Sequence, residues 1–135
     1  MINTKIAYKW VVQEEDNYYP LVNYGIDRGR RMNEPFYRLN GIYSNYKNIF
    51  QNSFASNSRL DFIPGYHFFL EAFPKVYNNH KYENLLARWE ACLSRVCGKN
   101  IKITILECLV NETDILIEQD NRLIASKFKV LNKKF

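Results

Sequence analysis

Glycine is scarce in this sequence, with five residues in 135. Neither a G-x-x-x-x-G-K-[ST] loop nor a G-x-G-x-x-G turn occurs, and these are the patterns whose glycine backbone cradles phosphates. Nucleotide hydrolysis or dinucleotide binding by those routes is therefore excluded. Long apolar runs are also missing, and none approaches the roughly 20 residues that a membrane-spanning helix needs. The first residues form no apolar segment of signal-peptide length either, so we expect a cytoplasmic protein without a membrane partner.

Metal-ligating side chains are few, with three cysteines and two histidines. There is no C-x-x-C pair, and Cys92 and Cys97 are five positions apart in a predicted helix, so their thiols would point away from each other. We predict that these two and Cys108 are reduced, buried thiols that act as small apolar residues. No metal and no cofactor are expected.

The composition is that of a globular protein, with 47% hydrophobic and 24% charged residues. A chain of this length fits one domain. We therefore predict a single domain over residues 1–135, with a less regular segment at about 25–60 where the periodic patterns weaken.

Alternating side chains indicate several strands. Over residues 5–12, Ile6, Tyr8, Trp10 and Val12 alternate with a partly basic set that includes Lys5 and Lys9, which predicts a strand with its apolar face inward. Further strands are predicted at 18–24, 101–110, 115–118 and 123–131, the first of them forming a hairpin with 5–12. Residues 60–69 are predicted to be extended, with a turn at Pro64-Gly65 that interrupts them.

The clearest helical pattern covers residues 81–97, where apolar residues form one stripe that includes Leu85, Leu86 and Trp89. Gly98 is suited to the left-handed residue that ends such a helix. The spacing of Tyr43, Tyr46, Phe50 and Phe54 fits a second short helix. These elements together predict an α+β fold, an antiparallel sheet packed by one main amphipathic helix.

Three short motifs form a combination of their own: Ala7-Tyr8-Lys9, Gly65-Tyr66-His67 and Ala125-Ser126-Lys127-Phe128-Lys129. This combination resembles a group of small, mostly phage-encoded domains of uncharacterised function, which begin with an AYK strand, carry a Gly-aromatic-His turn and end on an A-x-K strand. The resemblance implies a phage or viral source. It supplies no activity.

His67 is the first candidate for chemistry, because histidine titrates near neutral pH and Gly65 allows close approach of the backbone. General acid–base catalysis also needs a positioned partner, and no carboxylate, serine or cysteine motif adjoins His67. We therefore predict that Gly65 and His67 form a structural turn and that the protein is not an enzyme. An ADP-ribosyltransferase-like enzyme centred on His67 is kept as an alternative.

Basic residues are the second candidate, since the net charge is +5. They gather in one loop with Arg28, Arg30 and Arg31 and near the end with Lys127 and Lys129, where an acidic partner or a polyanion could bind. If the first and last strands are aligned, Lys5 and Lys9 would join Lys127 and Lys129 in one outward patch. Ordinary solvation of a sheet surface would also account for such lysines.

Aromatic residues are the third candidate. Tyr43 and Tyr46 lie among basic residues, as in proteins that stack single-stranded bases. The same spacing also fits a stripe facing the core, and exposed tyrosines are common at protein interfaces.

Together these observations predict a noncatalytic phage or viral accessory protein that binds a host protein or ribonucleoprotein. An inhibitor of host defence, for example of a CRISPR effector, is one concrete form of it. A nucleic-acid or nucleotide-binding protein that uses the basic and aromatic residues is the main alternative.

Overall fold

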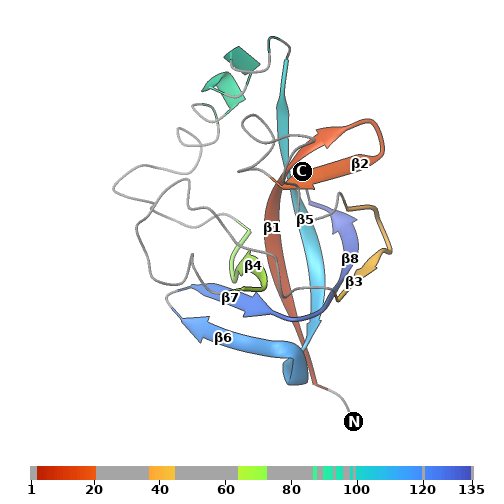
Figure 1. The fold of residues 1–135 in the computed structure, drawn as a ribbon, viewed down its shortest axis with the longest axis vertical. Coiled ribbons are helices and arrows are strands. Elements are labelled where there is room, and N and C mark those ends of the chain that lie inside the picture. The colour runs from red at the N-terminus through yellow and green to blue at the C-terminus, as the bar shows by residue number, and fades with distance from the viewer. Residues whose placement is uncertain are drawn as a thin grey trace.

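A computed structural model describes residues 3–20, 37–44, 64–72, 87, 90–92, 94–95, 98, 100–119 and 121–134. Eight strands join in one sheet, and every pair of neighbouring strands is antiparallel (Figure 1). The strands are β1 (Thr4–Glu14), β2 (Asn17–Pro20), β3 (Ile42–Tyr43), β4 (Tyr66–Phe69), β5 (Lys102–Asn111), β6 (Ile115–Gln119), β7 (Arg122–Ala125) and β8 (Phe128–Lys133).

The order across the sheet is β3-β8-β5-β1-β4-β7-β6, and β2 forms a hairpin with β1. β1 and β5 are the longest strands and pair from Thr4 opposite Asn111 to Gln13 opposite Lys102. These two strands form the twisted central ribbon that the shorter strands flank on either side (Figure 1). The predicted hairpin and the predicted strand at 101–110 are confirmed.

The predicted α+β class is wrong. Strands hold 61% of the described residues and helix 12%, and no helix among them reaches seven residues. Helical geometry is present at residues 87, 90–92 and 94–95, with a 3-10 turn at Glu112–Asp114. Most of the predicted apolar stripe of 81–97 lies outside the described residues, and of the predicted second helix only Tyr43 is described at its aromatic positions, in β3. The part of the chain that the structure describes is thus a mostly antiparallel β-sheet.

The predicted strand at 123–131 is in fact two strands that diverge. β7 pairs with β4 and β6, whereas β8 pairs with β5 and β3. At the corner between them, the backbone N–H of Ser126 donates to the carbonyl of Asp114 at 2.9 Å, and its hydroxyl donates to the same oxygen at 3.3 Å. The alternation of side chains predicts extended backbone on both sides of this corner but does not say which strands accept the hydrogen bonds.

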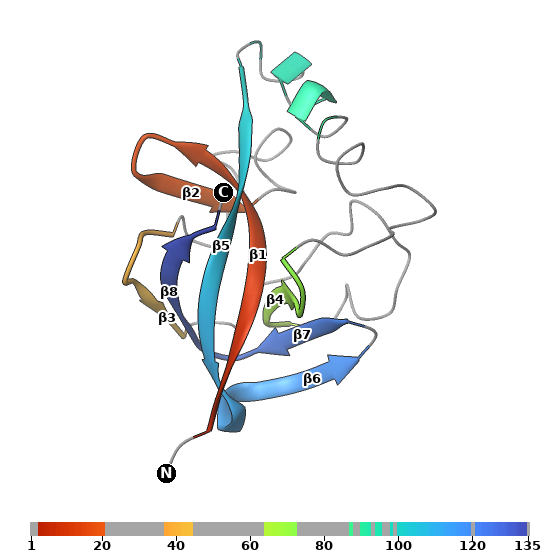
Figure 2. The same ribbon diagram turned by 180° about the vertical axis from the view of Figure 1, so that it is seen from behind.

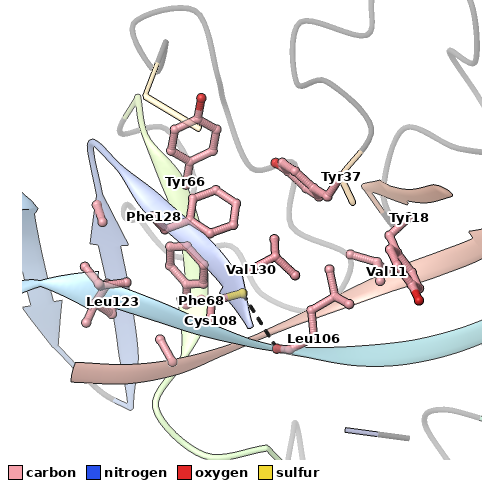
Figure 3. Close-up of a cluster of buried hydrophobic side chains, with 13 residues drawn as sticks. Val11, Tyr18, Tyr37, Tyr66, Phe68, Leu106, Cys108, Leu123, Phe128 and Val130 are labelled. Carbon is pink, nitrogen blue, oxygen red and sulfur yellow. Dashed lines mark hydrogen bonds between the residues drawn. The ribbon is translucent and has the colours of Figure 1, made fainter. Parts of the chain in front are cut away.

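The core lies on the face of the sheet that carries Phe128, which is 2% exposed (Figure 3). Its ring centroid is 4.9 Å from those of Tyr66 and Phe68, 5.3 Å from that of Tyr37 and 5.4 Å from that of Tyr43. Three of these contacts are edge-to-face, an arrangement in which the positive ring edge meets the negative ring face. Phe128 is therefore the centre of an aromatic cluster drawn from several strands.

The sequence predicts that the side of β1 with Lys5 and Lys9 faces outward, but this side faces the core. Ala7 and Val11 are fully buried, and Lys9 between them is 5% exposed. Ile6, expected to face inward, is 39% exposed. The reason is the partner strand, since β5 places Cys108 opposite Ala7 and Leu106 opposite Lys9, and both of these β5 side chains are fully buried.

Cys108 is buried as predicted, Cys92 is half-buried, and Cys97 lies outside the described residues. The Cys108 thiol contacts the Leu106 carbonyl at 3.8 Å (Figure 3). Burial raises its pKa to about 12, with Lys9 acting in the opposite direction and Glu107 adding to the rise. The thiolate is the reactive form of cysteine, so native Cys108 is an inert thiol.

We expect iodoacetamide at pH 8.5 to label Cys108 only after unfolding in a variant with Cys92→Ser and Cys97→Ser. The unfolded thiol releases its proton above its ordinary value of 9.0, while the native one keeps it up to about 12. The contribution of the buried Cys108 thiol to the free energy of unfolding is therefore complete below pH 9 and is lost as the pH rises from 9 to about 12. Mass spectrometry of the labelled chain checks the first expectation, and native labelling as fast as unfolded labelling would contradict it.

Candidate functional site

The predicted Gly65 turn begins β4 and brings it very close to β7. Gly65 has a φ of 148°, a conformation that side-chain-bearing residues rarely adopt. A Cβ atom at this position would lie 2.5 Å from Cγ2 of Ile124 and 3.3 Å from the carbonyl oxygen of Ala125. Only glycine fits here, because both the backbone angle and the space exclude a side chain.

His67 points away from the aromatic core, since its neighbours Tyr66 and Phe68 belong to the core cluster and side chains alternate along a strand. It is nevertheless 5% exposed. Nη2 of Arg122, on the neighbouring strand β7, lies 3.3 Å from Nδ1 of His67. A guanidinium group can only donate, so Nδ1 is the acceptor and a neutral ring carries its proton on Nε2. This contact orients the imidazole within the sheet.

The sequence alone does not predict that Lys9 is buried beside His67. Its Nζ donates to the carbonyl oxygen of His67 at 3.0 Å and lies 5.7 Å and 5.3 Å from the ring centroids of Tyr37 and Phe68. A buried ammonium group is stabilised by such a carbonyl and by the negative faces of aromatic rings. A lysine between Ala7 and Val11 looks like part of a basic outward face, and only the pairing with β5 turns it inward.

These contacts explain how β4 is held against β1. The two strands are paired at Tyr8 opposite Phe69, and the Lys9 ammonium adds a second connection at His67. Lys9, His67 and Arg122 therefore join three strands through the backbone and ring of one histidine. Such fixation favours a structural role for Gly65 and His67, which stays a prediction.

We expect Lys9→Met to lower the free energy of unfolding by about 1–3 kcal/mol, the usual cost of removing a donor from a buried acceptor. Methionine keeps most of the aliphatic stem but removes the ammonium. Urea unfolding of the variant beside Lys102→Met, a change at an exposed lysine of β5, measures the difference. An equal or higher stability of Lys9→Met would mean that desolvation of the ammonium outweighs its contacts.

Among the predicted binding residues that the structure describes, Tyr43 and Lys129 lie on opposite faces of the sheet. Arg28, Arg30, Arg31 and Tyr46 lie outside the described residues. Tyr43 belongs to the core side of β3, with its ring centroid 4.8 Å from that of Tyr37, and its hydroxyl accepts the backbone N–H of Arg38 at 2.8 Å. This half-buried ring therefore packs against the core and is not arranged as an open platform for a base.

Lys127 and Lys129 are separated from Lys5 and Lys9. β5 lies between β1 and β8. The neighbours of Lys129 in β8, Phe128 and Val130, belong to the core, so Lys129 lies on the face of the sheet opposite to that of Lys9. The expected patch of four lysines on one face is therefore wrong. Lys127 is exposed at the corner before β8, and Lys129 is half-buried within it.

Lys129 instead forms a row with aliphatic side chains across four strands. Lys129 lies opposite both Ile42 of β3 and Leu109 of β5, and Leu109 lies opposite Ile6 of β1. Directly opposed residues of antiparallel strands share a face, so all four point away from the core. Figure 2 shows the four strands side by side. We name Ile42, Lys129, Leu109 and Ile6 the open row.

The open row is the uncovered end of a face that is buried elsewhere. Further along β1 and β5 on this face, Trp10 is 6%, Val12 0%, Ile103 4% and Ile105 2% exposed. Trp10 is held there by its Nε1, which donates to the carbonyl of Ala72 at 3.1 Å, and by the ring of Phe69. In the open row, by contrast, Ile42 is 62% and Ile6 is 39% exposed. Apolar residues of one continuous face are thus packed at one end and in solvent at the other.

Comparison with known proteins identified no relative, since no family model, no curated protein and no solved structure matched the chain. Among the described residues, no helix is long and apolar enough to cross a membrane.

Proposed function

We propose that this protein is a noncatalytic accessory protein of a phage or virus that acts in the host cytosol by binding a host protein or ribonucleoprotein. The observation that supports it is the open row. Single exposed apolar residues are common on protein surfaces, but here two exposed isoleucines lie in one line across four neighbouring strands. A face of this kind is suited to burial in an interface with another protein.

Inhibition of host defence, for example of a CRISPR effector, is the concrete form of this function that we favour. It is supported by the resemblance to small phage-encoded domains and by the small size of the chain. His67 and Lys9 are buried and Arg122 is half-buried, and their contacts join three strands, which is in keeping with a structural and noncatalytic role for His67.

The main alternative, nucleic-acid binding through aromatic stacking, is less well supported. Of its two tyrosines, Tyr43 packs against Tyr37 and Phe128. The exposed large apolar side chains among the described residues are aliphatic, and aliphatic side chains offer no ring on which bases stack.

A pull-down from host lysate with the immobilised full chain, with and without nuclease, tests the proposed function. We expect a protein partner that is retained after nuclease treatment and at moderate salt, because apolar contacts are insensitive to screening. A nucleic-acid binder would lose its partner on nuclease treatment, and its affinity would fall steeply with salt. Loss of all capture under nuclease would therefore contradict the proposal.

A further inference from the structure

The charges around the open row indicate what kind of partner it binds, an inference that rests on the proposed function. Lys129 lies within the row, and Lys127 is exposed two residues before it. Glu107, the acidic residue on the same face of β5, already accepts from Nδ2 of Asn132 at 3.3 Å and lies 3.8 Å from Nζ of Lys134. Its charge is thus compensated within the chain. Lys127 and Lys129 form no ion pair with any residue that the structure describes.

We propose that the open row, flanked by Lys127, is the contact surface for an acidic host protein whose aliphatic side chains pack on Ile42 and Ile6. The row offers apolar area at its two ends and positive charge in its middle and at its flank. An acidic surface complements this charge, and such complementarity sets partner choice and the rate of association.

Two other occupants fit the surface less well. A second copy of the chain would bring its own Lys127 and Lys129 against the same residues, and the net charge of +5 adds to the repulsion. A nucleic acid would meet the lysines with its phosphates but would find isoleucine and leucine where its bases require rings or hydrogen-bonding groups. Both occupants remain outcomes that the experiment below can return.

Site-specific photo-crosslinking identifies the occupant directly. The photoreactive residue p-benzoylphenylalanine replaces Ile42 in one full-length chain and Leu116 in another. Leu116 is a matched control because it is 43% exposed and lies on β6, at the other end of the strand order. Both chains are irradiated in host lysate, and the attached molecule is identified by mass spectrometry.

We expect crosslinks from position 42, but not from position 116, to a host protein segment rich in aspartate and glutamate. Crosslinks from position 42 to RNA, to a second copy of this chain or to a basic protein segment would overturn the inference. A captured partner that crosslinks at position 116 and not at 42 would overturn the inference and leave the proposed function standing. A chain that captures no nuclease-resistant partner would overturn both.

Charge reversal gives a quantitative test with the captured protein. We expect Lys127→Glu with Lys129→Glu to weaken binding at least about tenfold, because a partner's carboxylates would then be repelled. The matched control is Lys102→Glu with Arg95→Glu, which changes the net charge equally at exposed positions away from the open row. Equal loss in both double variants would show that only overall charge matters and would overturn the contact surface. Unchanged circular dichroism spectra and melting temperatures confirm that both variants are folded.

Discussion

Phe128→Ala is expected to lower the free energy of unfolding by about 3–5 kcal/mol, the range for deleting a large aromatic side chain from a packed core. Among the rings that the structure describes, Phe128 is the one that meets Tyr37, Tyr43, Tyr66 and Phe68 together. Removing it leaves a cavity between rings from β3, β4 and the Tyr37 region. These rings are stiff and held by their own strands, so the site can collapse only in part.

Urea-induced unfolding followed by tyrosine and tryptophan fluorescence measures this change. Phe128→Leu keeps much of the apolar volume and is expected to cost clearly less than the alanine variant. Leu39→Ala, at a position 45% exposed, is expected to change stability by less than about 0.5 kcal/mol. Similar losses for Phe128→Ala and Leu39→Ala would show that the aromatic cluster is not the centre of the core.

Gly65→Ala is expected to be about as damaging, with a loss of about 2–6 kcal/mol from backbone strain and overpacking together. A side chain at a φ of 148° is strained by about 1–3 kcal/mol. The added Cβ would also lie 2.5 Å from Ile124, a residue that is 1% exposed and cannot move aside without disturbing β7. Overpacking of this kind costs a further amount of about 1–3 kcal/mol.

Gly98→Ala separates backbone strain from the overpacking against Ile124. Gly98 also has a positive φ, of 68°, but no atom lies within 4 Å of the position that a Cβ would take. Its replacement is expected to cost only about 1 kcal/mol, the strain of the left-handed conformation. If thermal unfolding shows equal losses for the two variants, backbone strain alone explains Gly65 and the close approach of β4 to β7 contributes nothing.

The open row shows how far sequence reasoning reached toward the site. The sequence predicts Lys127 and Lys129 as part of a basic cluster near the end of the chain, and the structure places Lys129 in a line with Ile42, Leu109 and Ile6. The aliphatic partners were missed, because they come from strands that are distant in the chain. Only one signal pointed to them, the period-two pattern of 5–12, and it assigned Ile6 to the core.

His67 and Lys9 illustrate the same limit at the buried cluster. A local motif predicts the turn at Gly65 and His67, and the constraint at Gly65 agrees with a turn there. The sequence predicts Lys9 only as a surface lysine. Its contact with the His67 carbonyl joins residues 58 positions apart, and no local pattern encodes such a pair.

What the sequence by itself determined is the local backbone: the extended runs at β1 and β5, the hairpin of β1 with β2, the glycine turn before β4 and the left-handed Gly98. These follow from side-chain alternation and backbone sterics, which act between near neighbours. The tertiary structure alone decided which face of β1 turns toward the aromatic core, where 123–131 divides into β7 and β8, and which apolar residues stay in solvent. Each of these depends on the strand that supplies the opposing hydrogen bonds, and the choice among partners is made by the packing of the whole sheet.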